Sequence, residues 1–84
     1  METRTILNVT INAHNKRENK LLNVIENYIS QCIDCDKRQL YYTRDWYLQE
    51  INGMFTALYM LGCIKEPTPS FVFNDLINLY IPFN

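Results

Sequence analysis

The sequence predicts a small, mainly helical α+β domain, with one amino-terminal strand followed by three helices. Two patterns support this fold class. Apolar and polar residues alternate over residues 5–13, as in a half-buried strand. Apolar residues then recur at helical spacing over residues 17–33 and 44–64. The 84 residues are enough for one globular domain, spanning 1–84, and leave no room for a second.

The predicted strand over residues 5–13 turns Leu7, Val9 and Ile11 to one side. A single strand leaves its backbone donors and acceptors unpaired, so it needs another strand beside it. The carboxy-terminal tail, the same strand of a second copy, or an edge of a target protein could supply that partner. We expect a homodimer in which Leu7, Val9 and Ile11 belong to the pairing strand.

The first helix is predicted over residues 17–33, because this stretch has no Gly or Pro and its apolar residues recur every three or four positions. Glu18 is expected to face outward, and residues 34–36 to end the helix. Thr43 is the expected N-cap of the second helix, since its hydroxyl can accept a hydrogen bond from a backbone N–H of the first turn.

Gly53 lies in the middle of this second helix, where a glycine usually permits close approach of another backbone. Gly62 is the expected end of the helix. A third, short helix is expected over residues 71–79, although the tail that follows it could also run extended.

Composition narrows the class of function. A net charge of −1 and a pI near 5.7 count against a general nucleic-acid binder, which needs a basic face for phosphates. No stretch approaches the roughly 18 apolar residues of a membrane span, and no secretory signal is visible, so we expect no membrane contact and a cytoplasmic location. The three cysteines are then expected to be free thiols.

The chain offers no recognisable catalytic or cofactor signature, so we expect no catalytic residues, no enzyme activity and no cofactor. Its two glycines cannot form a phosphate-binding loop, and its carboxylates are scattered. Cys32 and Cys35 form a C-x-x-C pair that, with Cys63 and His14, gives four potential zinc ligands. The spacing matches no common zinc finger, so we expect no metal and cysteines that pack as small buried hydrophobes.

Residues 37–47 combine basic and aromatic side chains, the types that anchor protein interfaces because they offer large apolar area with a polar tip. They could also stack on single-stranded nucleic acid, or pack into the core. Four aromatic residues so close together on one helix project in several directions, so at least one or two should be exposed. The candidate partner-binding residues are Lys37, Arg38, Tyr41, Tyr42, Arg44, Trp46 and Tyr47.

We therefore expect a small non-enzymatic protein-interaction module, an inhibitor or regulator that covers a functional site on a protein partner. The alternative is a helix-turn-helix transcriptional regulator built from residues 43–62 and 70–80, although the second of these helices would present Asn74, Asp75 and Asn78 but no Lys or Arg. In its richness in asparagine, isoleucine and tyrosine the chain is similar in style to accessory proteins of bacteriophages and mobile elements. That similarity implies a host factor as target and the bacterial cytoplasm as location.

Overall fold

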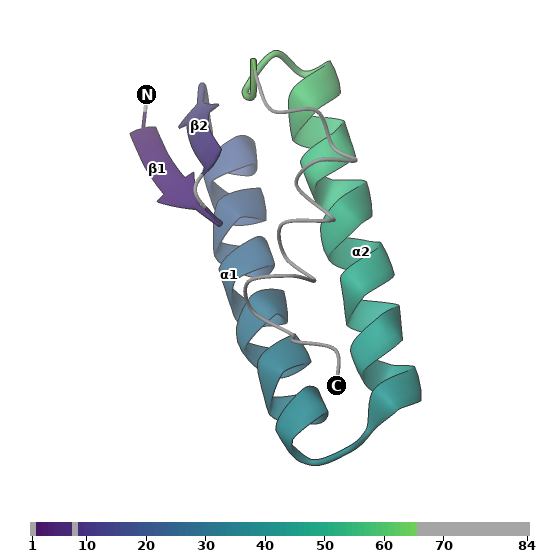
Figure 1. The fold of residues 1–84 in the computed structure, drawn as a ribbon. Helices are drawn as coiled ribbons and strands as arrows, with labels where there is room; N and C mark the ends of the chain where they lie inside the picture. The colour runs from purple at the N-terminus through teal and green to yellow at the C-terminus, as the bar shows by residue number, and fades with distance from the viewer. Residues whose placement is uncertain (1, 8, 66–84) are drawn as a thin grey trace.

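A computed structural model describes residues 2–7 and 9–65 of the protein (Figure 1). Two short strands, β1 (Glu2–Ile6) and β2 (Val9–Ala13), precede two long helices, α1 (Lys16–Lys37) and α2 (Tyr41–Met60). The predicted class, mainly helical with a small β element, is confirmed. Two helices are present in the described residues, and the third expected helix, over 71–79, lies outside them together with the recognition helix of the helix-turn-helix alternative.

The prediction of one strand over residues 5–13 is wrong, because the chain reverses within it. β1 and β2 pair antiparallel from Ile6↔Val9 to Glu2↔Ala13, so only two residues connect them. The first of these, Leu7, has a φ of 53°, a left-handed conformation that is unusual for a side chain of this size. The sequence has no glycine at this point to mark the turn, and the alternation of apolar and polar residues continues through the turn without a break.

The hairpin supplies the strand partner that a second copy was expected to provide. Leu7, Val9 and Ile11, the three residues expected at a dimer strand, are all buried in the core of their own chain. Because β1 pairs with β2 in the same chain, no second copy is needed to pair this strand. Strand addition by a partner could use the outer edge of β1, and the homodimer stays a prediction.

Arg4 fastens the hairpin to α1. Its guanidinium bridges from β1 to Glu26 at 2.5 Å and donates to the side-chain oxygens of Asn23 and Asn19 at 2.8 and 3.0 Å. The hydrogen bond to Glu26, together with that to Glu2, raises the pKa of Arg4 above its usual value. Figure 1 shows the resulting arrangement, with the hairpin lying along the first half of α1.

Each helix ends in the same hydrogen-bonding motif, in which a residue with positive φ follows the C-cap. At the end of α1 this residue is Gln39, with a φ of 62°, and the N–H of Leu40 bonds the carbonyl of Cys35. At the end of α2 it is Gly62, with a φ of 79°. The expected end of α1 at residues 34–36 is therefore too early, because Asp and Cys do not break a helix and the left-handed residue does.

The same turn places the start of α2 earlier than the sequence predicts. Leu40 completes the turn after α1 and already accepts the first hydrogen bond of α2 from the N–H of Arg44. The helix therefore begins at Tyr41, and Thr43, the expected N-cap, lies inside its first turn. Gly62 as the end of α2 is confirmed, since the N–H of Cys63 beyond it bonds the carbonyl of Leu58.

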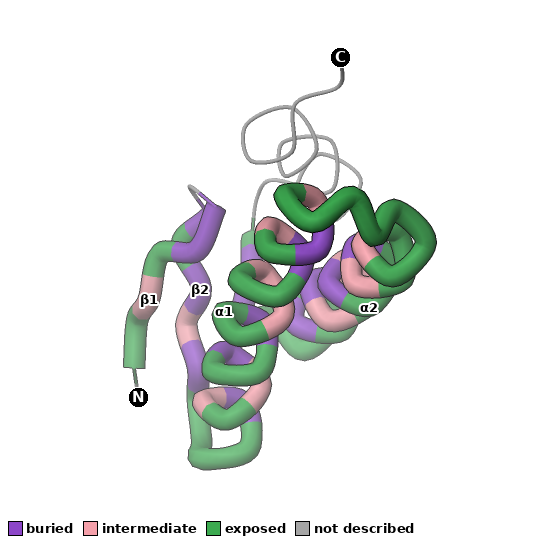
Figure 2. The backbone as a smooth tube through the Cα atoms, turned by 90° about the horizontal axis from the view of Figure 1, so that it is seen from below, coloured by how far each residue is buried: buried purple, intermediate pink, exposed green. Residues whose placement is uncertain are grey.

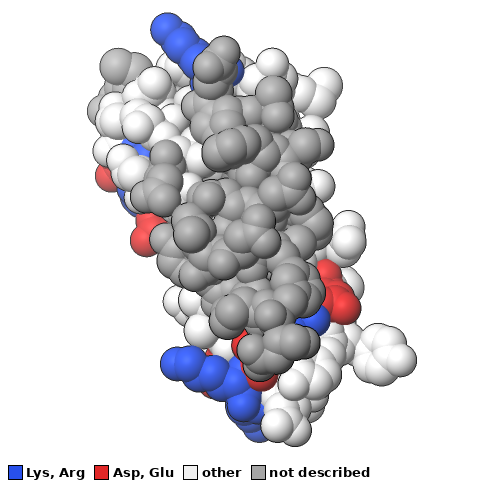
Figure 3. Space-filling view, viewed as in Figure 1, with Lys and Arg blue, Asp and Glu red and all other residues white. Residues whose placement is uncertain are grey.

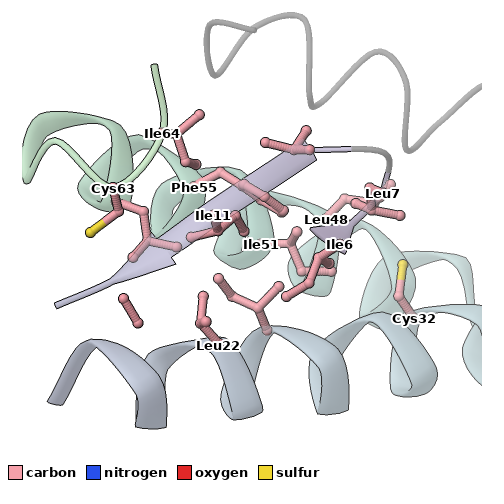
Figure 4. Packing of buried hydrophobic residues seen from close by; sticks show 14 residues of the cluster. Ile6, Leu7, Ile11, Leu22, Cys32, Leu48, Ile51, Phe55, Cys63 and Ile64 are labelled. Carbon is pink, nitrogen blue, oxygen red and sulfur yellow. The ribbon is translucent and has the colours of Figure 1, made fainter. Parts of the chain in front are cut away.

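The core lies where the two helices and β2 face one another (Figures 2 and 4). Fully buried residues from all three elements meet there: Val9, Ile11, Leu22, Ile25, Ile51, Phe55 and Leu58. Gly53 is exposed, and apart from its chain neighbours and the adjacent backbone of its own helix, no atom of the described residues lies within 4 Å of where its Cβ would be. In the described part of the chain, Gly53 therefore does not serve to let another backbone approach.

Between residues 2 and 65, neither helix has the length and apolar content that crossing a membrane requires.

Candidate functional site

The seven candidate partner-binding residues lie around the turn that joins α1 to α2, which we call the α1–α2 bend. It comprises Lys37, Arg38, Tyr41, Tyr42, Arg44, Trp46 and Tyr47. Lys and Arg side chains gather at this end of the molecule in Figure 3. The side chains of the bend nevertheless divide into a supporting group and an exposed group.

Arg44 belongs to the supporting group. Its guanidinium donates to Asp36 on α1 at 2.7 Å and to Asp45 at 3.1 Å, and it lies 4.8 Å from the centre of the Tyr41 ring. These carboxylates raise the pKa of Arg44, the hydrogen bond to Asp36 contributing most. Because only 13% of the side chain is exposed, Arg44 joins the two helices rather than offering a free charge.

Tyr47 also supports the bend, and it does so with a residue that the sequence did not suggest. Tyr28 of α1 packs its ring edge-on against Tyr47 at 5.2 Å between centroids and contacts Trp46 at 5.9 Å. Trp46 and Tyr47 are themselves 5.0 Å apart and nearly perpendicular. This three-ring cluster fixes the orientation of Trp46, although half of the Trp46 surface remains exposed.

The exposed group consists of Lys37, Arg38, Tyr41, Tyr42 and Trp46. Tyr42 is 95% exposed, so its ring contributes almost nothing to the folded core. Tyr42 and Trp46 are four residues apart on α2 and therefore share a face of the helix. Two large aromatic side chains are thus held at the surface by a helix whose opposite face is buried.

Acidic residues balance the charge of the bend. Asp36 and Asp45 bind Arg44, and Arg38 lies 3.5 Å from Asp34 in an exposed ion pair. The three carboxylates offset the three basic residues, Lys37, Arg38 and Arg44. The bend and these three neighbouring carboxylates together have no net charge, which is unfavourable for holding a phosphate backbone.

A second group of functional side chains lies at the other end of the molecule, where β2, α1 and the turn after α2 meet. We call it the junction cluster: His14, Glu18 and Cys63. The Oε1 atom of Glu18 accepts from the backbone N–H of His14 at 2.7 Å and from the thiol of Cys63 at 3.1 Å. His14 Nδ1 lies 2.9 Å from the same oxygen and 3.7 Å from Cys63 Sγ.

Helix capping explains how Glu18 comes to this position. Asn15 is the N-cap of α1, and its side chain accepts from the N–H of Glu18 at 2.9 Å. A glutamate three residues after the N-cap can turn back toward the chain before the helix, as in a capping box. Glu18 is therefore buried, contrary to the outward position expected from helical spacing.

Within the junction cluster, the surroundings favour the ionised carboxylate of Glu18 and the protonated thiol of Cys63. The hydrogen bond from the backbone of His14, followed by that from Cys63, lowers the pKa of Glu18. Burial and the nearby Glu18 raise the pKa of Cys63 to about 11. A buried thiol held in its protonated form is a poor nucleophile, so the cluster does not have the properties of a catalytic cysteine.

The C-x-x-C pair lies apart from the junction cluster. Cys32 is fully buried, donates to the carbonyl of Arg44 at 3.6 Å, and has its pKa raised to about 11 chiefly by burial. Cys35 is also buried. Two of the four potential zinc ligands in the sequence, His14 and Cys63, lie together with Glu18 in a group of three possible ligands.

Comparison of the chain with protein-family models, with curated proteins and with solved structures gives no match.

Proposed function

We propose that the protein is a protein-binding module that uses the exposed residues of the α1–α2 bend to cover a site on a partner protein. The observation that carries this proposal is the exposure of Tyr42 and Trp46 on one face of α2. Large aromatic side chains gain the most from being covered by a partner, and Trp, Tyr and Arg dominate the energetics of interfaces.

The supporting residues strengthen this proposal because they make the surface rigid before binding. The ion pairs of Arg44 and the packing of Trp46 against Tyr28 and Tyr47 hold the bend in one arrangement. A preformed surface loses little conformational entropy on association. The same features favour inhibition or regulation by occupancy, in which the bend blocks the partner's own site.

The second candidate function, nucleic-acid binding through Lys37, Arg38 and Arg44, has less support. Arg44 is already engaged by two carboxylates, and the bend and its three neighbouring carboxylates together carry no net charge. A contact from Arg44 to a phosphate would have to displace Asp36 or Asp45. Salt concentration separates the two candidates, because binding through several phosphates weakens steeply between 50 and 200 mM salt.

The test uses a double variant, Arg38→Ala with Tyr42→Ala, as bait in extracts of the native host. Both side chains are exposed, so the melting temperature should change little, and the free energy of unfolding should stay within about 0.5 kcal/mol. A matched control, Lys20→Ala with Tyr59→Ala, likewise removes one exposed basic side chain and one exposed tyrosine, from positions away from the bend.

We expect wild type and the control to capture the same protein at 150 mM salt and after nuclease treatment, and the bend variant to lose it. Capture that survives in the bend variant would show that the bend is not the binding surface. Capture abolished by nuclease would favour the nucleic-acid alternative.

A further inference from the structure

We propose that the junction cluster is a zinc-binding site, with His14 Nδ1, Glu18 Oε1 and Cys63 Sγ as its three protein ligands. This inference is independent of the protein-binding function proposed for the bend. It also revises the sequence-based expectation of no metal, which rests on the C-x-x-C pair with Cys63 and His14 and does not include Glu18.

The donor atoms of the junction cluster lie close to the spacing of zinc ligands. The three atoms are separated by 2.9, 3.1 and 3.7 Å. Zinc bonds of the usual length to nitrogen, oxygen and sulfur place neighbouring ligands of a tetrahedron roughly 3.3–3.6 Å apart. Each donor atom would therefore move by only a few tenths of an ångström to bind the ion.

The three donor groups also have the chemistry of zinc ligands. Imidazole, carboxylate and thiolate are the three side-chain groups that zinc prefers, and a site of all three suits a borderline-soft cation better than calcium or magnesium. Binding forms a zinc–sulfur bond and releases the thiol proton of Cys63 to solvent, while the neutral imidazole of His14 carries its one proton on Nε2 and leaves Nδ1 free to bind the ion. The carboxylate and the resulting thiolate then neutralise the two positive charges of the ion.

Helix capping explains only part of the junction cluster. Capping accounts for the Glu18 carboxylate and its bond to the backbone of His14. It does not require an imidazole and a buried thiol, from a residue 45 positions further along the chain, to approach the same oxygen. These are the two additional groups that a zinc site needs.

The surroundings of the junction cluster give the ion a rigid base and a way in. The backbone of Cys63 is held by its N–H bond to Leu58 and by its carbonyl, which accepts from Asn12 of β2 at 3.0 Å. The second oxygen of Glu18 lies 3.4 Å from the side-chain nitrogen of Asn15. The His14 side chain is 46% exposed, so the ion can enter from solvent and keep a water as its fourth ligand.

The test is titration of the reduced, untagged full chain with Co²⁺, a spectroscopic substitute for zinc. We expect one equivalent to bind, with a thiolate-to-cobalt charge-transfer band in the near ultraviolet that disappears when zinc is added. Cys63→Ser should lose the band. Cys35→Ala, which removes a thiol of the C-x-x-C pair, should keep it.

Cys63 is fully buried, so Cys63→Ser could fail to fold, and two further variants keep the test decisive in that case. His14→Ala removes a half-exposed side chain and Glu18→Gln is nearly isosteric, so circular dichroism can establish that each is folded. Both should bind Co²⁺ at least about tenfold more weakly than wild type. Zinc should raise the melting temperature of wild type, reversibly with chelator, and leave that of His14→Ala unchanged.

Three results would overturn the proposal. Wild type without a charge-transfer band would leave the junction cluster as a helix cap alone. A band that persists in folded His14→Ala at wild-type affinity would exclude the imidazole as a ligand. A band lost in Cys35→Ala and kept in Cys63→Ser would move the metal to the C-x-x-C pair.

Discussion

Exchanging the residue types at the two helix ends should change stability in opposite directions. Gln39 and Gly62 occupy equivalent positions after α1 and α2, with φ values of 62° and 79°. A residue with a Cβ pays about 1–2 kcal/mol to adopt this left-handed conformation. Glycine avoids that strain but loses about 0.5–1 kcal/mol more conformational entropy on folding. The difference between these two terms sets the expected effect.

Gln39→Gly should therefore stabilise the protein by about 0.5–1 kcal/mol, and Gly62→Ala should destabilise it by a similar amount. For a domain of this size the first change corresponds to a rise in melting temperature of about 2–8 °C. Gln39 is exposed, and a Cβ at Gly62 would meet no atom of the described residues within 4 Å, so backbone conformation should dominate both effects.

Urea unfolding followed by far-ultraviolet circular dichroism measures both changes, with Gln39→Ala as the control. The alanine variant loses the glutamine side chain but keeps the Cβ, so its midpoint should stay close to that of wild type. The reasoning is refuted if Gln39→Gly unfolds at the same or a lower urea concentration with an unchanged m-value, or if Gly62→Ala is neutral.

Three further outcomes follow from the contacts described above. Gly53→Ala should raise stability by about 0.5–1 kcal/mol in thermal unfolding, because the site is an exposed helix interior with open space for a Cβ; a loss of stability would indicate that something covers it. Because the folded-state pKa of Glu18 is lowered, its contribution to stability is present above the ordinary glutamate pKa of about 4.3 and is lost as pH falls through the lowered value. Urea midpoints measured between pH 3 and 7 should therefore decline less with acid in Glu18→Gln than in wild type, and parallel curves would contradict this. With pKa values of about 11, Cys32 and Cys63 should react with iodoacetamide at pH 8 far more slowly in the folded than in the unfolded chain, as followed by mass spectrometry; equal rates would show that neither thiol is protected.

Helices α1 and α2 could be predicted from the sequence, but the boundary between them could not. Periodicity over long stretches is a strong signal, so the core positions Ile51, Phe55 and Leu58 of α2 were found. The boundary between α1 and α2 depends on a left-handed Gln39, a conformation that no local sequence signal marks. Where Gly62 supplies that conformation at the end of α2, the boundary was predicted correctly.

The hairpin and the junction cluster were missed for related reasons. Leu7 is a poor turn residue by propensity, and its burial in the core outweighs the backbone strain. The junction cluster joins residues from distant parts of the chain, which periodicity cannot bring together. One signal was present: an asparagine followed three residues later by a glutamate, Asn15 and Glu18, is a capping pattern that turns the carboxylate back toward His14.

The hydrogen bond from the backbone N–H of Asn12 to the carbonyl of Cys63 joins the β hairpin to the pair of helices, and its opening can be measured. Asn12 and Thr3 face each other in the antiparallel sheet. The backbone N–H of Asn12 points away from β1 toward Cys63, so the two residues exchange no backbone hydrogen bonds, and the backbone N–H of Thr3 points away from β2. The amide of Thr3 points outward from the edge and can exchange with deuterium in the folded state. The amide of Asn12 exchanges only when the chain after α2 detaches, so its opening free energy reports the attachment of the strands to the helices. A protection lower than that of the α2 core amides would mean that the β hairpin can leave while the helical pair stays folded.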